Sequence, residues 1–148
     1  MATSLPQVPP TRIDFTPEDQ EWIANRIKDV LASGRLTLGA FGEQFEREFT
    51  NLTGSRHAIA VNSGTASLEI MLRAMDVAGK DVLVPANTFF ATASAVIGAG
   101  GRPVLMDTDV ATLSTSLDEI KRRLTPETAG IMIVHIAGII TAEMPEIG

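Results

Sequence analysis

Apolar side chains recur at every third or fourth position over the first third of the chain, which is the spacing of one face of an α-helix. A first helix is predicted to begin after Thr16, because a hydroxyl cap followed by Pro17 and two acidic residues suits a helix N-terminus. Gly34 is expected to end this helix. A second helix, ending near Gly54, is predicted from an apolar face that consists of Phe41, Phe45, Phe49 and Leu52.

After residue 56 the pattern changes to short apolar runs separated by helix-like segments. Strands are predicted at residues 57–61, 82–84, 103–106 and 131–136, since buried parallel strands are nearly continuous apolar runs. The last helical segment is opened by a capping box of Ser116 and Glu119, with Leu117, Ile120 and Leu124 facing inward. Alternation of strands and helices predicts a parallel sheet with right-handed crossovers, so the expected fold class is α/β.

The 148 residues are enough for one domain with a core of its own. We expect the proline-rich residues 1–10 to form a flexible N-terminal tail. Residues 11–56 are expected to form a helical segment, and residues 57–148 the α/β part. A glycine-flanked loop at residues 34–39 joins the two predicted helices and can reach outward.

Composition and charge exclude several classes of protein. A formal net charge of −6 and a pI near 4.8 argue against a nucleic-acid-binding protein, which needs a basic surface. The absence of cysteine excludes disulfides, thiolate metal sites and cysteine nucleophiles. The longest apolar stretch, residues 130–140, is too short for a membrane span, which needs about 20 residues. With no signal-peptide pattern at the N-terminus, we expect a cytoplasmic protein without a membrane partner.

Ligands of parallel α/β sheets bind beyond the carboxyl ends of the strands, and two turns fall there. The first turn consists of small residues, Ser63, Gly64, Thr65 and Ala66. A phosphate at this turn would gain the unpaired amides of the helix, the helix dipole and the hydroxyls of Ser63 and Thr65. Alternatively, Ser63 or Thr65 only caps the helix and Gly64 only turns the chain.

The second turn carries Asn87, Thr88, Phe89 and Phe90. An aromatic ring at the start of a helix, beside a phosphate turn, can stack on a flat cofactor ring. Alternatively, both phenylalanines belong to the core. Adjacent helical positions point about 100° apart, so one ring can also be core while the other faces the crevice.

Two histidines are too few for most histidine-based metal sites. His135, at the end of the last predicted strand, is either an active-site residue or a hydrogen-bonded structural one, and His57 is expected to be surface or structural. Asp107 and Asp109 could bind a metal or exchange protons, but the Asp-Thr-Asp sequence suits a loop equally well, and we favour the loop.

A cluster of basic residues lies on the helix that the capping box opens. It consists of Lys121, Arg122 and Arg123, and we expect it to be a solvated face.

Residues 11–138 resemble the amino-terminal half of the DegT/DnrJ/EryC1/StrS family of sugar aminotransferases, which are pyridoxal-phosphate enzymes of the aspartate-aminotransferase fold. Four stretches carry the resemblance in the family's order and spacing, namely residues 34–46, 57–66, 84–92 and 134–138. The resemblance implies that residues 57–148 are part of the large domain of a type I pyridoxal-phosphate enzyme. That domain has a mostly parallel sheet flanked by helices, here preceded by two N-terminal helices.

The resemblance also implies where pyridoxal 5'-phosphate would bind. The family's Ser-Gly-Thr turn holds the cofactor phosphate, which points to Gly64, Thr65 and the Ala66 amide. The aromatic residue after Pro-x-x-Thr stacks on the pyridine ring, which points to Phe89. The loop at residues 34–39 would lie near a nucleotide-sugar substrate at a dimer interface. No catalytic residue and no metal ligand is assigned to this chain.

The family's Schiff-base lysine has no counterpart among Lys28, Lys80 and Lys121, which lie in or beside predicted helices and outside the family's lysine motif. We therefore expect the amino-terminal half, as a fragment or split subunit, of an aminotransferase. A complementary C-terminal polypeptide would supply the lysine. The assembled dimeric enzyme would move an amino group, with glutamate as donor, to a nucleotide-linked keto sugar in amino sugar biosynthesis. The alternative is a non-catalytic module, derived from that family, that binds a phosphate ligand or a protein partner.

Overall fold

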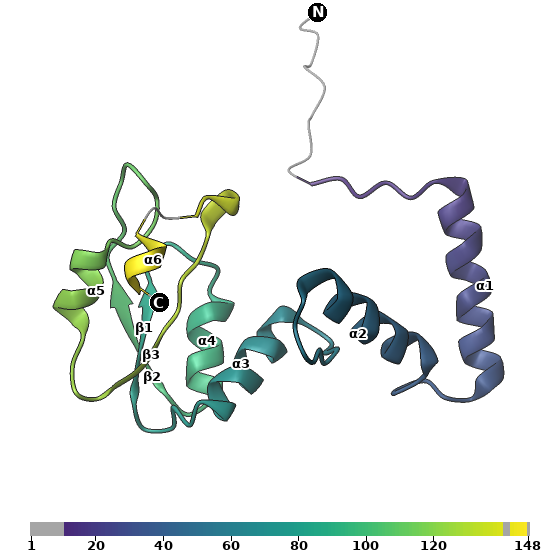
Figure 1. Cartoon of the computed structure of the whole chain (residues 1–148), viewed down its shortest axis with the longest axis horizontal. Coiled ribbons are helices and arrows are strands. Elements are labelled where there is room, and N and C mark those ends of the chain that lie inside the picture. Colours follow the sequence, from purple (N-terminus) through teal and green to yellow (C-terminus); the bar gives the residue numbers. More distant parts are fainter. Residues whose placement is uncertain (1–10, 141–142, 148) are drawn as a thin grey trace, which may run out of the picture. The chain divides into compact units, whose positions relative to one another are not determined.

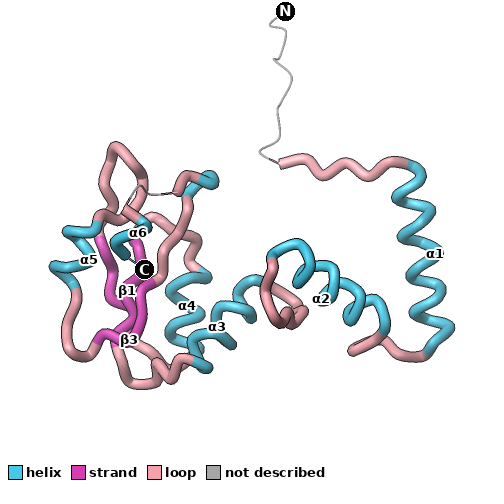
Figure 2. The backbone as a smooth tube through the Cα atoms, viewed as in Figure 1, coloured by secondary structure: helices cyan, strands magenta, loops and turns pink. Residues whose placement is uncertain are grey.

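The computed structural model describes residues 11–140 and 143–147, and the chain divides into two units between Ala60 and Val61 (Figures 1 and 2). The tail predicted for residues 1–10 lies outside the described residues.

Two helices make up most of the first unit. In α1 (Pro17–Ser33) the Thr16 hydroxyl accepts a 3.1 Å hydrogen bond from the Asp19 N–H, and the Asp19 carboxylate accepts one from the Thr16 N–H. Gly34 ends α1 in the left-handed conformation, at φ 68°. The second helix, α2 (Ala40–Thr53), ends in the same way at Gly54. Both predicted helices are therefore confirmed.

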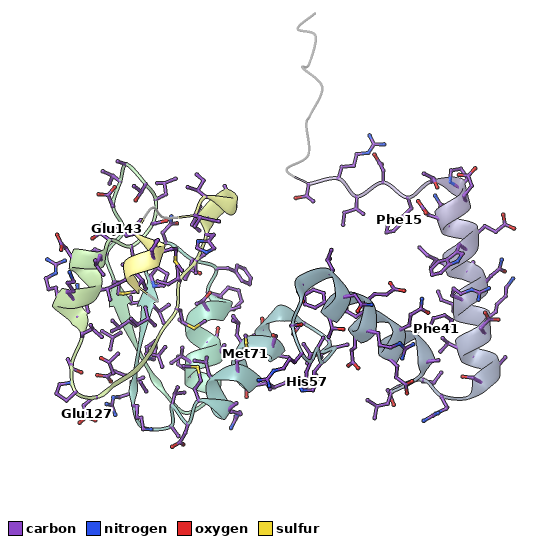
Figure 3. The ribbon with its side chains drawn as sticks, viewed as in Figure 1. Phe15, Phe41, His57, Met71, Glu127 and Glu143 are labelled. Carbon is purple, nitrogen blue, oxygen red and sulfur yellow. The ribbon has the colours of Figure 1, made fainter. Side chains whose placement is uncertain are left out.

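Neither α1 nor α2 buries a side chain. Their apolar faces are formed as the sequence spacing predicts, yet they remain open to solvent in this chain. Phe41 projects from the first turn of α2 and is labelled in Figure 3. The most exposed apolar side chains of the two helices are Trp22, Ile27, Leu31, Phe45, Phe49 and Leu52.

The second unit is built on a three-stranded parallel sheet in the order β2-β1-β3. The strands are β1 (Asp81–Pro85), β2 (Arg102–Met106) and β3 (Thr128–Ile131). The helices between them are α3 (Gly64–Ala74), α4 (Ala91–Gly98) and α5 (Leu117–Arg123). After β3 come a short 3-10 turn, η1 (Ile136–Gly138), and α6 (Met144–Ile147). The α/β class and the parallel sheet are confirmed.

Alternate side chains of β1 point into two separate cores, as expected for a strand covered on both faces. Val82 and Val84 pack on one face with side chains of α3 and α4, namely Leu72, Ala95, Val96 and Ala99. Leu83 packs on the other face with Met106 of β2 and Ile120 of α5. Figure 1 shows α4 and α5 on opposite sides of the sheet.

The strand predicted at residues 57–61 is wrong for this structure, which has a loop there (Figure 2). A strand needs a hydrogen-bonded neighbour. Here the Ala60 N–H instead donates a 2.8 Å hydrogen bond to the Glu46 carboxylate, and Ile59 is 82% exposed. The segment has the apolar content of a buried strand, but no described strand pairs with it and most of its side chains are exposed.

The last strand begins three residues earlier than predicted and ends at Ile131. Ile131 pairs with Leu83, and only Val84 and Pro85 of β1 follow. Because Pro85 has no N–H to donate, pairing stops there, after a last 2.8 Å bond from the Met132 N–H to the Leu83 carbonyl. The early start includes Gly130, where a β-carbon would lie 3.3 Å from the Met75 methyl group.

Candidate functional site

The turn at the N-terminus of α3 has two backbone donors free to bind a ligand. Ser63 is the N-cap, and its hydroxyl accepts a 3.2 Å hydrogen bond from the Ala66 N–H. The N–H groups of Gly64 and Thr65 precede the first intrahelical acceptors, and no acceptor for them is present among the described residues. A β-carbon added at Gly64 would meet nothing within 4 Å, so a ligand can reach this backbone closely.

The two roles considered for this turn are compatible. Ser63 does cap the helix, as in the alternative that gives this turn only a structural role, but the cap uses only the Ala66 amide. Gly64 and Thr65 keep their donors, at the positive end of the α3 dipole. A phosphate that also used the Ala66 amide would have to displace the Ser63 hydroxyl. Phosphate binding by Gly64, Thr65 and Ala66 stays a prediction.

The start of α4 follows the carboxyl end of β1, and α3 packs against α4, so we expect the N-terminus of α3 to point toward the same edge of the sheet. The C-terminal ends of the two helices meet, because the Arg73 guanidinium donates to the Gly98 carbonyl and pairs with Glu69 at 2.8 Å. The loops at these ends also meet, where the Gly79 N–H donates to the Gly100 carbonyl at 2.8 Å. Those loops precede β1 and β2, so they lie at the amino edge.

Phe89 and Phe90 lie on the loop that enters α4, and neither is a core residue. Phe89 is 69% exposed and Phe90 is 72% exposed. Their rings contact each other in a tilted arrangement, with centroids 4.5 Å apart and planes at 53°. The alternatives that placed one or both rings in the core are therefore wrong for this chain. Both rings can contact a ligand, and stacking of Phe89 on a cofactor ring stays a prediction.

Hydrogen bonds at three successive residues hold the loop that carries these rings. The Ala86 N–H donates to the Met106 carbonyl at 2.9 Å, and the Asn87 side-chain amide donates to the Leu113 carbonyl at 3.3 Å. The Thr88 and Thr92 hydroxyls are hydrogen-bonded at 2.8 Å. The aromatic loop is thus tied to the end of β2 and to the segment that follows it.

The segment after β2 is a folded loop, as favoured from its Asp-Thr-Asp sequence. The Asp109 carboxylate accepts from the Ala111 N–H at 2.8 Å and from the Thr112 N–H at 3.0 Å. These backbone hydrogen bonds, above all that of Thr112, hold the pKa of Asp109 below its usual value of 3.8. Among the described residues, no group of three or more histidine or acidic side chains is arranged to hold a metal ion.

Glu119 is a buried carboxylate whose role the sequence did not reveal. It is 5% exposed, accepts a 3.0 Å hydrogen bond from the Asp107 N–H, and pairs with Arg122 and with Arg123, the latter at 2.8 Å. The side chains of Arg122 and Arg123 are 65% and 39% exposed, so this face is solvated as predicted, but both guanidinium groups also pair with the buried carboxylate. Their spacing of three and four residues from Glu119 was the signal, because these positions share one side of a helix.

The predicted capping box is only half formed, because its acid has other partners. The Ser116 hydroxyl accepts from the Glu119 N–H at 3.2 Å, while the Glu119 carboxylate binds Asp107 and the arginines. Of the three side chains expected inside, Ile120 is buried, Leu117 is half-buried and Leu124 is exposed.

The histidines lie on the surface. His135 follows the end of β3 and precedes η1, and its carbonyl accepts a 3.0 Å hydrogen bond from the Gly138 N–H. Its imidazole has no hydrogen-bond partner in the described part of the chain. The structure thus gives no support to the hydrogen-bonded structural role. His57, labelled in Figure 3, is exposed, as expected for a surface residue.

In the first unit, the glycine-flanked loop borders a hollow of about 360 Å³. Leu38 in this loop has a positive φ of 50°, a conformation that non-glycine residues seldom adopt. The polar side chains at the hollow are Asp29, Ser33, Arg35 and Thr37.

A family model described as the DegT/DnrJ/EryC1/StrS aminotransferase family matches residues 17–148. The chain belongs to this family. The predicted family is thus confirmed. The match covers residues 17–148, whereas the resemblance seen in the sequence covered residues 11–138.

A curated relative in the family is the 3-oxo-glucose-6-phosphate:glutamate aminotransferase of Bacillus subtilis strain 168. It is 36% identical over 137 residues, which are 92% of this chain and 31% of the relative. The chain therefore spans about a third of that protein's length.

Solved structures of the DegT family share the fold of this chain. The protein Spr1654 of Streptococcus pneumoniae, a proposed sugar aminotransferase, is 32% identical with a TM-score of 0.82, over 91% of this chain and 33% of its own. NtdA of Bacillus subtilis, solved with bound PMP, is 36% identical with a TM-score of 0.80, over 86% of this chain and 29% of its own. Structures of Spr1654 exist in PLP and PMP forms, in agreement with the predicted cofactor.

Among the described residues, no helix is long and apolar enough to span a membrane.

Proposed function

We propose that this DegT-family chain binds the phosphate and ring of pyridoxal phosphate as part of a sugar aminotransferase. One observation carries the proposal. The free amides of Gly64 and Thr65 lie at the start of α3 and the exposed ring of Phe89 lies just before α4, and these two helices pack against each other with their C-terminal ends together. A phosphorylated aromatic ligand needs both features.

The residues present fit the cofactor. Gly64 leaves space for a phosphate against the backbone, and the Gly64 and Thr65 amides, the Thr65 hydroxyl and the helix dipole would stabilise its charge. Phe89 would hold the flat face of the ring and exclude water from it. The bound cofactor would supply the electron sink that lets an amino group pass between substrates. The chain's own part is to bind and orient it.

The lysine that this chemistry requires is best supplied from outside these residues. Lys80 directly precedes β1, at the amino edge, and its ammonium donates to the Asp76 carbonyl at 2.8 Å. Lys121 lies on α5, which covers the other face of the sheet. Lys28 lies on α1, in the first unit. A further sequence, on the same chain or on a complementary C-terminal polypeptide, would carry the catalytic lysine.

The exposed apolar faces of α1 and α2 support the need for further sequence. Two amphipathic helices with no buried side chain obtain little stabilisation from packing within this chain. The C-terminal piece, or a second subunit of the dimer, would cover them. Phe45 and Phe49, whose ring centroids are 6.3 Å apart on α2, offer such a contact.

For the substrate, we propose a nucleotide-linked keto sugar, with glutamate as amino donor. The related Bacillus subtilis protein is named as a glutamate aminotransferase of a phosphorylated oxo-sugar. Arg35 and Thr37 border the hollow at the glycine-flanked loop and could bind a phosphate of such a substrate. The reaction would take place in amino sugar biosynthesis in the cytoplasm.

Binding of pyridoxamine 5'-phosphate to the 148-residue chain tests the cofactor part of the proposal. This form has no aldehyde, so it does not react with surface lysines. Phe89→Ala should weaken binding, whereas the neighbouring Phe90→Ala, which removes an equally exposed ring, should have a smaller effect. Equal binding by wild type and Phe89→Ala would remove Phe89 from the site.

A second experiment tests the need for a complementary piece. The chain is mixed with pyridoxal phosphate, treated with borohydride and digested, with and without a polypeptide carrying the C-terminal two thirds of a family member. Cofactor fixed to a lysine of the added polypeptide supports the proposal. Complete transamination by the 148-residue chain alone would refute it. If the chain binds pyridoxal phosphate, but no added polypeptide leads to a product that borohydride can fix to a lysine, the result would favour the non-catalytic module.

A further inference from the structure

We infer that Asn87 is a positioning residue for the Phe89 ring and that it acts through the backbone carbonyl of Leu113. The inference rests on the proposed contact between Phe89 and the cofactor ring. It assigns a role to Asn87, and to the loop of residues 107–116, that goes beyond direct binding of the cofactor.

The Phe89 ring needs positioning because its own surroundings do little to fix it. The side chain is 69% exposed, and its ring partner among the described residues is the equally exposed Phe90. Its direction therefore depends on the backbone of residues 86–90. That backbone is fixed at its start, where the Ala86 N–H donates to the Met106 carbonyl at 2.9 Å.

Asn87 supplies the next attachment. Its side-chain amide donates to the Leu113 carbonyl at 3.3 Å, across 26 positions of the sequence. The following attachment, between the Thr88 and Thr92 hydroxyls, is local and joins the loop only to the first turn of α4. Among the described side chains of residues 86–90, Asn87 is thus the one that ties the loop to another segment.

The Leu113 carbonyl is a fixed acceptor because its loop is closed on Asp109. The Leu113 N–H donates to the Asp109 carbonyl at 2.8 Å, and the Asp109 N–H donates to the Ser114 carbonyl at 2.9 Å. The Asp109 carboxylate accepts from two further amides inside the loop, those of Ala111 and Thr112. Leu113 itself has a φ of 58°, a left-handed conformation that is unfavourable for leucine, so the surrounding loop must hold it there.

The loop is also anchored at both ends, so it can serve as a support. At its start, the Asp107 N–H donates to the buried carboxylate of Glu119. At its end, Ser114 and Thr115 are each 6% exposed, and Ser116 caps α5. A hydrogen bond from Asn87 therefore fixes the aromatic loop against a segment that is itself held by α5.

A double-mutant cycle on the full chain tests the inference, with pyridoxamine 5'-phosphate and inorganic phosphate as the two probes. Asn87→Ala should weaken pyridoxamine phosphate binding by roughly two- to ten-fold, as for the loss of one hydrogen bond, and leave phosphate binding unchanged. The double variant with Phe89→Ala should bind no more weakly than Phe89→Ala alone, because Asn87 acts through that ring. Asn51→Ala, the same truncation on α2, is the matched control.

Several outcomes separate this inference from the proposed function. If Phe89→Ala weakens binding but Asn87→Ala does not, or if the two effects add, the positioning role is wrong and the proposed function stands. If Phe89→Ala has no effect, or if the wild-type chain binds neither probe, the proposed function fails and this inference fails with it.

A second pair of variants covers the case in which Asn87→Ala does not fold. Asp109→Ala removes the carboxylate that accepts from the Ala111 and Thr112 amides inside the loop, whereas Asp109→Asn keeps an oxygen for both amides. We expect Asp109→Ala to weaken pyridoxamine phosphate binding selectively and to reduce the induced circular dichroism of the bound ring. Asp109→Asn should restore both. Equal behaviour of the two variants would overturn the role of the loop.

Discussion

The N–H of Asp107 donates a 3.0 Å hydrogen bond to the Glu119 carboxylate, which joins the residue after β2 to the first turn of α5. The same carboxylate pairs with the guanidinium groups of Arg122 and Arg123. The Glu119 side chain is buried, whereas both arginines reach solvent. The negative charge of the buried carboxylate is therefore balanced by two positive charges at the surface. This arrangement stabilises the loop that follows β2.

Removing both arginines should cost more than the sum of the single losses. Arg122→Ala leaves Glu119 paired with Arg123, and Arg123→Ala leaves it paired with Arg122. We expect each change to lower the free energy of unfolding by about 1 kcal/mol or less. The double variant leaves a buried carboxylate without a cation, so about 3 kcal/mol or more is expected. Urea unfolding of the four proteins measures the coupling. Strictly additive losses would show that solvent already screens this carboxylate.

The pH dependence of stability should reflect the Asp109 carboxylate. Its pKa in the folded chain lies below the usual 3.8, so it stabilises the fold above that pH. The contribution is lost as the pH falls below 3.8 and the folded-state group takes up a proton. Asp109→Asn has no charge to titrate. The difference in unfolding free energy between wild type and Asp109→Asn should therefore be constant at neutral pH and shrink below about pH 4. A difference that grows toward acid would contradict this assignment.

Local signals in the sequence were enough to predict α1, α2 and the order of elements around the sheet. Thr16 and Pro17 define the start of α1, and Gly34 defines its end. The segments that were wrong depend on partners distant in the sequence. Residues 57–61 have the apolar content of a strand, but no described strand lies beside them. β3 ends early because Pro85 of the neighbouring strand has no N–H to donate.

The candidate site was predictable only in part for the same reason. Gly64 and Phe89 stand in recognisable motifs at helix starts, so their places could be found from sequence. The bond from Asn87 to Leu113 spans 26 positions and uses a backbone carbonyl, which no side-chain pattern reveals. The burial of Glu119 likewise follows from the packing of α5 on the sheet, although its spacing to Arg123 was visible.

Ser63→Ala should destabilise the chain in a way that phosphate partly reverses. The change removes the acceptor of the Ala66 N–H, and loss of such an N-cap costs about 1 kcal/mol. Added inorganic phosphate can then accept from the Ala66 amide as well as from those of Gly64 and Thr65. We expect thermal unfolding in saturating phosphate to show a smaller difference between variant and wild type than unfolding without it. An equal difference in both buffers would mean that phosphate does not reach the Ala66 amide.

Gly64→Ala should separate binding from stability. A β-carbon at this position meets nothing within 4 Å, and the φ of Gly64 is not positive, so alanine fits the fold without strain. Alanine also favours a helix over glycine by up to about 1 kcal/mol, so the free energy of unfolding should be unchanged or higher. The added methyl group would, however, occupy the space where a phosphate approaches the backbone. We expect pyridoxamine phosphate binding to weaken by roughly ten-fold, or about 1.4 kcal/mol, measured by calorimetry.

Gly101→Ala is the matched control, because it should do the opposite. Its β-carbon would lie 3.1 Å from a Val96 methyl group and 3.3 Å from the Val77 carbonyl oxygen, inside the core between α4 and the sheet. Overpacking of this kind typically costs about 1–3 kcal/mol of unfolding free energy, while the turn at Gly64 is untouched. Binding by the folded Gly101→Ala protein should therefore equal that of wild type. If Gly64→Ala bound pyridoxamine phosphate as tightly as Gly101→Ala, the phosphate would have to lie elsewhere than against the first turn of α3.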